Sequence, residues 1–196
     1  MVIYNESNTA HTVVMDAKAM AETLRTIARA VVDGNPEIQS LVILGILSRG
    51  RPLADRLAEL IHELTGYRPQ VGSLSTTFYR DDLHAGSGAV VVRSGQTHFD
   101  FSVDERTVLL VDDVIAAGRT TRAALDEVMD YGRPHRIQLV SLVDRGCREL
   151  PIQPDYLGME ITTKPEEWVS VHIEEIDGED AVLLNRRLTS PKSEEN

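Results

Sequence analysis

Residues 108–122, VLLVDDVIAAGRTTR, contain the pattern that decides the fold. An apolar run ends at Asp112 and Asp113, and a turn of small residues follows. The run is typical of a buried parallel strand, and Thr120 or Thr121 is suited to cap the helix that the next apolar positions predict. Free amides at a helix N-terminus bind phosphate, and carboxylates beside them bind hydroxyls or a cation. The segment therefore predicts a ligand with a phosphate at one end and sugar hydroxyls or a metal at the other.

The length and composition predict one globular domain. The chain has 196 residues, of which 42% are hydrophobic, as is usual for a protein with a single buried core. No stretch is long and apolar enough to span a membrane, and the first ten residues lack signal-peptide features. The single cysteine, Cys147, excludes an intramolecular disulfide and fits a reducing compartment, so we expect a cytoplasmic protein. The six histidines are scattered, and no cluster predicts a zinc site.

The net charge argues against nucleic acid as the main partner. The chain carries 31 Asp and Glu residues against 20 Lys and Arg residues, a formal net charge of −11. Proteins bind nucleic acid largely by neutralising phosphates with Lys and Arg. An RNA-binding function therefore requires a local basic patch.

Strands and helices alternate on both sides of the opening segment. Apolar residues at helical spacing predict one helix from Asp16 to about Val32 and another from Pro52 to Gly66. The other predicted elements are strands at 41–47, 71–79, 107–111 and 136–143, a helix at 121–131, and short final strands at 168–173 and 181–184. This alternation predicts an α/β domain with a mainly parallel sheet.

Residues 75–105 interrupt the alternation. Two β-prone stretches, 89–93 and 97–101, flank a Ser-Gly-Gln turn and predict a β-hairpin arm. An arm between core strands serves as a lid or as a partner contact. We expect one domain over residues 1–188, and a disordered polar tail over residues 189–196.

Ligands of parallel sheets bind at the carboxyl ends of the strands. This rule places the loops 48–50, 112–121 and 144–148 on one rim of the sheet. One aspartate at a strand end often only caps the next turn, but two in succession before a small-residue turn favour a ligand site. A nucleotide hydrolase also places two aspartates there, but it needs a phosphate loop ending in Gly-Lys-Ser or Gly-Lys-Thr. The chain contains no Gly-Lys pair, which excludes that class.

Several segments resemble one enzyme family. VLLVDDVIAAGRTT resembles the phosphoribosyl diphosphate (PRPP) loop of type I phosphoribosyltransferases. Three further segments resemble the subfamily that combines pyrimidine operon attenuation with uracil phosphoribosyltransferase activity: FYRDDL at 78–83, YGRPHRIQLVSLVDRG at 131–146 and RELPIQPDYLG at 148–158. The similarity extends from about residue 16 to residue 184.

The resemblance implies a fold, a reaction and a set of partners. The fold is a mainly parallel sheet flanked by helices, with a β-hairpin lid arm and a small hood. The reaction is uracil plus PRPP giving UMP plus diphosphate, assisted by Mg²⁺. No strong nucleophile or base is required, because positioning uracil against C1′ supplies much of the acceleration. The implied partners are PRPP, uracil, UMP or UTP, leader mRNA and further copies of the chain in a homodimer or larger oligomer.

The resemblance also assigns roles by position. Two aspartates would hold the ribose hydroxyls with help from the cation, and two arginines would meet the diphosphate, so the catalytic candidates are Asp112, Asp113, Arg49 and Arg80. Ser48 and Gly50 complete the short diphosphate loop. The 5′-phosphate would lie on Ala116, Ala117, Gly118, Arg119, Thr120 and Thr121. Uracil would be read mostly by backbone near Val143, Asp144, Ile161 and Thr162. No side-chain cluster for a resident metal is expected beyond the two aspartates.

The chain departs from the family pattern in two regions. In the phosphate loop, Ala117 replaces a Thr or Ser, which removes one hydroxyl contact and weakens PRPP binding by about 1 kcal/mol. In the RNA-facing region, Cys147 replaces a His, Glu22 stands where a cation is expected, and Met159 replaces a Lys. The basic residues that remain as candidates for RNA binding are Arg25, Arg29, Arg145 and Arg148.

Three functions fit these residues. The first is a uracil phosphoribosyltransferase that also regulates pyrimidine operon transcription. The second is an RNA-binding attenuator whose nucleotide site senses UMP or UTP with little or no turnover, since the same fold can serve either function. The third is a phosphoribosyltransferase for another base.

Overall fold

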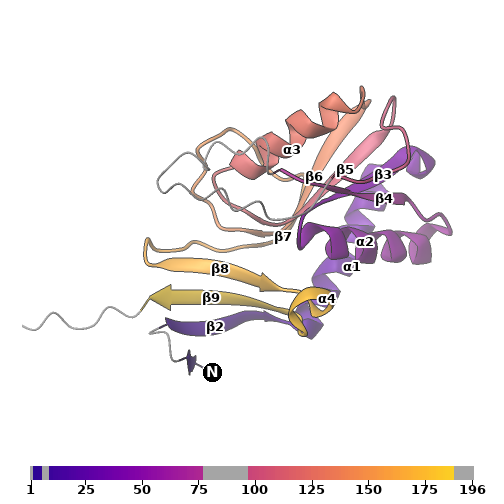
Figure 1. Cartoon of the computed structure of the whole chain (residues 1–196). Coiled ribbons are helices and arrows are strands. Elements are labelled where there is room, and N and C mark those ends of the chain that lie inside the picture. Colours follow the sequence, from indigo (N-terminus) through magenta and orange to yellow (C-terminus); the bar gives the residue numbers. More distant parts are fainter. Residues whose placement is uncertain (1, 6–8, 77–96, 188–196) are drawn as a thin grey trace, which may run out of the picture.

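A five-stranded parallel sheet forms the centre of the protein (Figure 1). The computed structural model describes residues 2–5, 9–76 and 97–187. The sheet consists of β3 (Leu41–Ile46), β4 (Gln70–Leu74), β5 (Thr107–Ile115), β6 (Arg136–Asp144) and β7 (Tyr156–Glu160). The strand order is β4-β3-β5-β6-β7, and all four pairings are parallel. The α/β class predicted from the sequence is confirmed.

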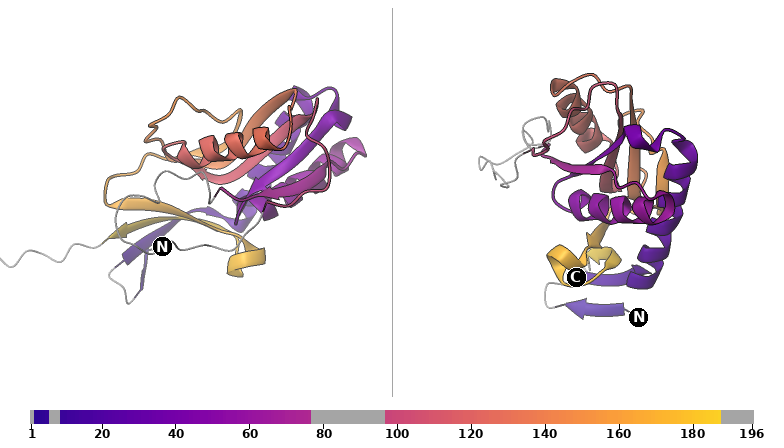
Figure 2. Two further views of the ribbon diagram at one scale, coloured as in Figure 1. Left: turned by 45° about the horizontal axis from the view of Figure 1, so that its top comes forward. Right: turned by 90° about the vertical axis from the view of Figure 1, so that its right-hand side faces the viewer.

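Three helices cover the two faces of this sheet. They are α1 (Ala17–Gly34), α2 (Gly50–Thr65) and α3 (Arg119–Asp130). The first two pack with Ile43, Leu109 and Val111 on one face, whereas α3 packs with alternate strand residues such as Leu44 and Leu110 on the other. Figure 2 shows this arrangement from two further sides. Every residue of β3 is buried because helices cover both faces of the strand.

The helix starts follow local chemistry only in part. Asp16 caps α1, and its carboxylate accepts the Ala19 backbone N–H at 2.8 Å, as predicted. The prediction that Thr120 or Thr121 caps the later helix is wrong, because α3 begins two residues earlier, directly after Gly118. Gly118 has φ of 88°, a left-handed conformation that glycine adopts without steric cost, so the backbone itself makes the turn.

A small antiparallel sheet, which we call the hood, lies below the parallel sheet in Figure 1. Its strands are β1 (Val2–Asn5), β2 (Thr9–Asp16), β8 (Glu167–His172) and β9 (Ala181–Arg187), in the order β1-β2-β9-β8. The short helix α4 (Glu174–Asp177) connects β8 to β9. The two final strands and the hood itself confirm the predictions, whereas β1 and β2 were not predicted.

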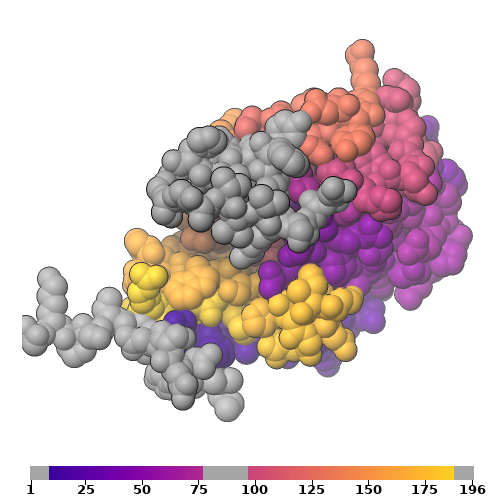
Figure 3. Space-filling view, viewed as in Figure 1, coloured from indigo at the N-terminus to yellow at the C-terminus, as the bar shows by residue number. Residues whose placement is uncertain are grey.

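Ion pairs join the hood to the core. The Arg56 guanidinium of α2 donates to both oxygens of Glu175, at 2.9 and 2.6 Å, and to both oxygens of Asp180, at 2.8 Å each. Figure 3 shows the surface of this contact, where the yellow segment around α4 lies directly against the purple core. Because both carboxylates follow β8, these bonds set the position of the α4 turn relative to α2.

The predicted arm needs a correction in its described part. Residues 97–101 are not a strand: His98 forms only an isolated antiparallel bridge with Ser73, with both backbone hydrogen bonds at 2.9 Å. Phe99 and Phe101 instead pack against the core, which draws the chain away from regular pairing. The other predicted arm strand, 89–93, and the tail at 189–196 lie outside the described residues.

Other parts of the parallel sheet also differ from the prediction. β4 ends at Leu74, so residues 75 and 76 are not strand, and 77–79 lie outside the described residues. β5 continues past the two aspartates to Ile115, because Val114 and Ile115 still pair with β6. β7, which was not predicted, adds an edge to the sheet beside β6. A short 3₁₀ turn, η1 (Ile38–Ser40), precedes β3.

Candidate active site

The carboxyl ends of β3, β5 and β6 meet at one rim of the parallel sheet, as predicted. In the register of these strands, Gly45 pairs with Val111, Ile115 pairs with Asp144, and Asp144 pairs with Glu160. The loops that follow the three strands therefore begin side by side. The hood faces the same rim, since β5 contacts β8.

The two aspartates lie within the last part of β5. Asp112 is only 5% exposed, and its carboxylate accepts the Asp113 backbone N–H at 3.1 Å. Burial raises the pKa of the Asp113 carboxyl, although the hydrogen bond with Asp112 and the positive charge of Arg49 act in the opposite direction. A carboxylate whose pKa is raised by desolvation is typical of a site that binds a cation or hydroxyl donors.

The phosphate loop after β5 is held from behind by the segment after β6. The Ala117 carbonyl accepts two backbone N–H groups, from Glu149 at 3.0 Å and from Leu150 at 3.1 Å. The Ala116 carbonyl accepts from the Arg148 guanidinium at 2.8 Å. Since these carbonyls are bound, the loop has a defined shape before any ligand arrives.

The first turn of α3 contains the polar side chains of this loop. The Thr121 hydroxyl is buried and has no hydrogen-bond partner within the described ranges. A phosphate oxygen at this helix N-terminus would give that hydroxyl an acceptor. Thr120 is half-buried, and Arg119 forms an exposed ion pair with Glu149 at 2.6 Å.

The diphosphate loop packs tightly against β5. A Cβ atom on Gly50 would lie 2.4 Å from the Val111 carbonyl oxygen, so only glycine fits this position. The Leu47–Ser48 peptide bond is cis, and the Leu47 N–H donates to the Leu74 carbonyl at 2.9 Å. These contacts place the loop beside the strand that carries Asp112 and Asp113.

Arg49 links the diphosphate loop to both the aspartates and the hood. Its guanidinium donates to the two carboxylate oxygens of Asp177, from Nε at 3.1 Å and from Nη2 at 2.7 Å. These hydrogen bonds lower the pKa of the Asp177 carboxyl. Asp177 was not predicted as a site residue. Its only sequence signal is an acidic run at 174–180 that contains no Lys or Arg.

The predicted uracil residues meet through backbone at the end of β6. The Ile161 N–H donates to the Asp144 carbonyl at 2.8 Å, and Val143 is fully buried beneath them. Thr162 is exposed and follows directly. The Asp144 carboxylate is bound by both terminal nitrogens of Arg148, at 2.9 and 2.6 Å. Burial raises the pKa of Asp144, but these bonds and the Gly146 N–H outweigh it, so the pKa is lowered overall.

The four candidates for RNA binding have different surroundings. Arg25 and Arg29 are exposed on α1, one helical turn apart, and Arg25 forms an exposed pair with Glu22 at 3.5 Å. Arg148 is turned inward, where it binds Asp144 and the carbonyls of Ala116 and Ile152. Arg145 is half-buried, and its Nε atom has no hydrogen-bond partner within the described ranges. Arg80 lies outside the described residues.

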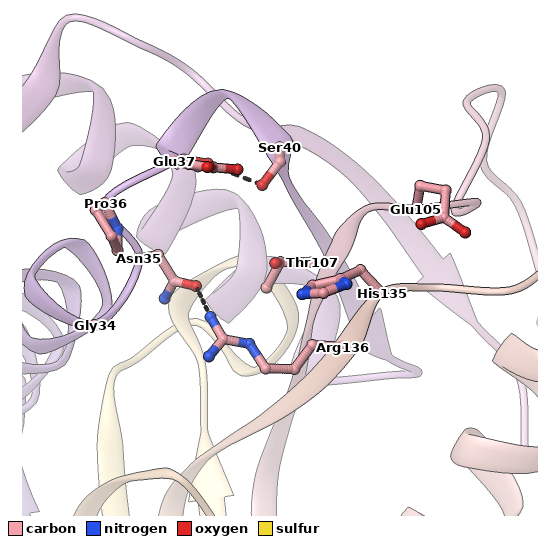
Figure 4. Close-up of a pocket in the computed structure, with 9 residues that line it drawn as sticks. All are labelled: Gly34, Asn35, Pro36, Glu37, Ser40, Glu105, Thr107, His135 and Arg136. Atoms are coloured by element: carbon pink, nitrogen blue, oxygen red, sulfur yellow. Dashed lines mark hydrogen bonds between the residues drawn. The ribbon is translucent and has the colours of Figure 1, made fainter.

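The opposite end of the sheet contains a separate cavity of about 420 Å³ (Figure 4). Thr107 and Arg136, the first residues of β5 and β6, line it together with the end of α1. Arg136 donates to the Asn35 side-chain carbonyl at 2.8 Å, which fastens α1 to β6. The cavity therefore lies away from the rim that carries the aspartates.

Comparisons with known proteins agree with this geometry. Residues 13–175 match the family described as phosphoribosyl transferase domain. The chain is 45% identical over 170 residues to the Bifunctional protein PyrR of Clostridioides difficile, an alignment that covers 87% of this chain and 95% of the relative. Its identity to the protein of the same name from Pelotomaculum thermopropionicum is 48% over 171 residues, covering 87% and 93%. The chain belongs to the PyrR family of phosphoribosyltransferases.

Solved structures support the fold assignment for this PyrR family member. The hypoxanthine phosphoribosyltransferase of Trypanosoma cruzi superposes with a TM-score of 0.67 at 14% identity, covering 90% of this chain and 97% of that one. The corresponding enzyme of Staphylococcus aureus gives 0.64 at 16% identity, covering 91% and 92%. These matches confirm the type I phosphoribosyltransferase fold predicted from the sequence. Across the described ranges, no helix has the length and apolar character to cross a membrane, and no three His, Cys, Asp or Glu side chains are arranged to hold a metal.

The raised pKa of Asp113 predicts a distinctive stability profile for the substitution Asp113→Asn. The folded protein binds the Asp113 proton more tightly than the unfolded chain, where an aspartate titrates near ~3.9. This carboxyl therefore favours folding below that pH and loses that contribution as pH rises through its folded pKa. We expect Asp113→Asn to unfold at a higher urea concentration than wild type at pH 7, with a difference that shrinks toward pH 4.

The matched control is Asp126→Asn, which removes the same charge from a partly exposed side chain paired with Arg122. It should change the urea midpoint little at either pH. An Asp113→Asn protein that is no more stable than wild type at pH 7 contradicts the assigned burial of this carboxylate.

Proposed function

We propose that this protein transfers the phosphoribosyl group of PRPP to uracil, giving UMP and diphosphate. The observation that carries the proposal is the meeting of three loops on one rim: the phosphate loop, the diphosphate loop and the backbone pair of Asp144 and Ile161. PRPP and uracil together present a 5′-phosphate, a ribose, a diphosphate and a base, and we assign one of these groups to each part of the rim. We also propose that the protein acts in the cytoplasm as a homodimer or larger oligomer.

The reaction breaks one bond and forms another: the diphosphate leaves C1′, uracil N1 bonds to C1′, and the N1 proton passes to the departing diphosphate or to solvent. The first half separates charge. The bond from C1′ to a diphosphate oxygen breaks, so that the ribose gains oxocarbenium character while negative charge grows on the leaving group. The Arg49 guanidinium at the diphosphate loop stabilises that negative charge. Asp112 and Asp113 bind and orient the ribose hydroxyls, and the turn at 116–121 fixes the 5′-phosphate.

The residues at the rim fit a bound Mg²⁺. Mg²⁺ prefers carboxylate oxygens together with substrate phosphates, and Asp113 is a half-buried carboxylate whose pKa is raised by desolvation. When bound with PRPP, the ion would neutralise part of the diphosphate charge. Asp112 and Asp113 are the residues that would hold it.

The base site favours a ligand that needs no acidic or basic side chain. The Asp144 carboxylate is already bound by two nitrogens of Arg148 and by the Gly146 N–H. It is therefore occupied as an acceptor and does not act as a proton carrier. We assign recognition of uracil to the backbone of the loops that follow Asp144 and Ile161, because the carbonyl and N–H groups of uracil complement peptide groups.

Steady-state assays with PRPP and Mg²⁺ test the base directly. We expect turnover with uracil and none with guanine or hypoxanthine. We expect Asp112→Asn and Asp113→Asn to lower kcat/KM for PRPP by about hundredfold, because each removes a charge used in the transition state. Turnover of a purine base without uracil turnover would assign the protein to another phosphoribosyltransferase activity.

Ala117→Thr tests the missing hydroxyl of the phosphate loop. A threonine here adds a donor to the 5′-phosphate, worth about 1 kcal/mol, so the KM for PRPP should fall by about fivefold. Ala117→Val is the matched control, since valine has the shape of threonine without its hydroxyl. Equal KM values for the two variants would show that the residue acts only by its size.

We propose regulation of pyrimidine operon transcription by RNA binding as a second function, in keeping with the bifunctional relatives. Arg25 and Arg29 support it, because both are exposed on the same helix. Arg148 contributes to the fold of the loop instead, since its guanidinium is used internally.

Binding of a leader stem-loop RNA across a salt series, with and without UMP, tests this function. We expect affinity to fall as salt rises, with a log–log slope that decreases by about 1 for each of Arg25→Ala and Arg29→Ala. Arg51→Ala is the control, because Arg51 is on α2 and pairs with Asp55. A flat salt response in wild type would contradict RNA binding.

A further inference from the structure

The ion pair between Arg49 and Asp177 occupies the arginine that the proposed reaction assigns to the diphosphate. The two hydrogen bonds are 3.1 and 2.7 Å long and use Nε and Nη2, the same edge of the guanidinium. Both side chains are mostly covered, with 31% of Arg49 and 18% of Asp177 exposed. This is a two-bond pair of fixed geometry between the diphosphate loop and the hood.

A carboxylate and a phosphate compete for such an edge. Both present two oxygens to the parallel N–H groups of a guanidinium, so each fills the same donors. Diphosphate oxygens therefore gain the Nε–Nη2 edge of Arg49 only when Asp177 releases it. The hood thus places a carboxylate on the Arg49 edge that the diphosphate would use.

We propose that Asp177 is an internal competitor of the PRPP diphosphate for Arg49, and that it sets how tightly the protein binds PRPP. This inference rests on the proposed function, which assigns Arg49 to the diphosphate. The apparent affinity is then the intrinsic affinity reduced by the fraction of molecules in which Arg49 is free.

The surroundings of Asp177 keep the competitor in place. One of its oxygens also accepts the Ile173 N–H at 2.9 Å, which fixes the carboxylate within the α4 turn. That turn is held against α2 by the four hydrogen bonds of Arg56 to Glu175 and Asp180. The hydrogen bonds from Arg49 also lower the pKa of Asp177, so the carboxylate stays charged at neutral pH. The Asp177 carboxylate is thus held in place by hydrogen bonds and is charged at neutral pH.

Release of Arg49 has a consequence for the hood. Among the described residues, Arg49 and Arg56 both tie the α4 turn to the core, through Asp177 in the first case and through Glu175 and Asp180 in the second. When diphosphate takes Arg49, the Arg56 pairs remain. The hood then loses one of its attachments while the phosphate and base loops keep theirs, so ligand binding loosens α4 and leaves the rim intact.

The substitution Asp177→Asn tests this proposal. Calorimetry measures how tightly the variant and wild type bind Mg²⁺-diphosphate and Mg²⁺-PRPP in the absence of uracil. Asparagine keeps an oxygen for the Ile173 N–H but presents no charged pair to Arg49. We expect both ligands to bind about three- to tenfold more tightly than to wild type, the scale of one partly exposed ion pair. Unchanged or weaker binding overturns the proposal.

Two further variants separate competition from a general change of charge. Glu179→Gln removes the same charge two residues away, from an exposed side chain paired with His172, and leaves the partners of Arg49 and Arg56 in place, so it should bind both ligands as wild type does. In an Arg49→Gln background, Asp177→Asn should produce no gain, because the contested donor is gone. A gain of equal size in Glu179→Gln, or one that persists without Arg49, shows a field effect and overturns the proposal.

The same proteins distinguish failure of this inference from failure of the proposed function. Tighter diphosphate binding by Asp177→Asn, with no uracil turnover by wild type, leaves Asp177 as the competitor and removes only the assigned reaction. Uracil turnover by wild type, with no change of affinity in Asp177→Asn, removes the competitor and leaves the reaction.

Discussion

The close approach of the diphosphate loop to β5 is the constraint on which the site depends. The Val111 carbonyl would lie 2.4 Å from any Cβ atom at position 50, so the start of α2 reaches β5 only because this residue is glycine. That contact places Arg49 beside Asp113. β5 and β6 pair in parallel with Ile115 beside Asp144, so the loop after β6 begins at the same rim. The absence of a side chain at Gly50 thus allows the loops proposed to bind diphosphate, ribose and base to meet at one rim.

Arginines that face inward hold the loops of that rim together. Arg148 joins the phosphate loop to the base loop, Arg56 joins α2 to the hood, and Arg49 joins the diphosphate loop to Asp177. In each case the arginine donates to a carboxylate or a backbone carbonyl, and charge-assisted bonds of this kind are the stronger ones. The net charge of −11 understates the local importance of cations, because these arginines act within the fold and contribute little to a basic surface.

Local patterns predicted the elements whose residues decide their own structure. Asp16 caps α1 and the apolar spacing of the helix continues to its end, so both were readable from sequence. β1, β2 and β7 were not predicted because their own residues carry no strong alternation, and β2 pairs with β9, which lies more than a hundred positions away in the sequence. The aspartates and the phosphate loop had a local signature. The pair of Arg49 with Asp177 spans 128 positions, and only the folded chain brings the two together.

Each end of the proposed PRPP site has a feature that would lower the affinity for PRPP. At the proposed phosphate end, Ala117 lacks the hydroxyl that the family pattern places there, so the backbone and the α3 N-terminus would bind the 5′-phosphate without it. At the diphosphate end, Arg49 is engaged by Asp177 before the ligand arrives. Both features lower affinity without removing a group that acts on the ribose. Weaker binding moves the range of PRPP concentrations over which a site responds to higher values, so that the site is not saturated at concentrations that would fill a tighter one. That property suits a protein that couples synthesis of UMP to a regulatory response, because a saturated site reports nothing about supply.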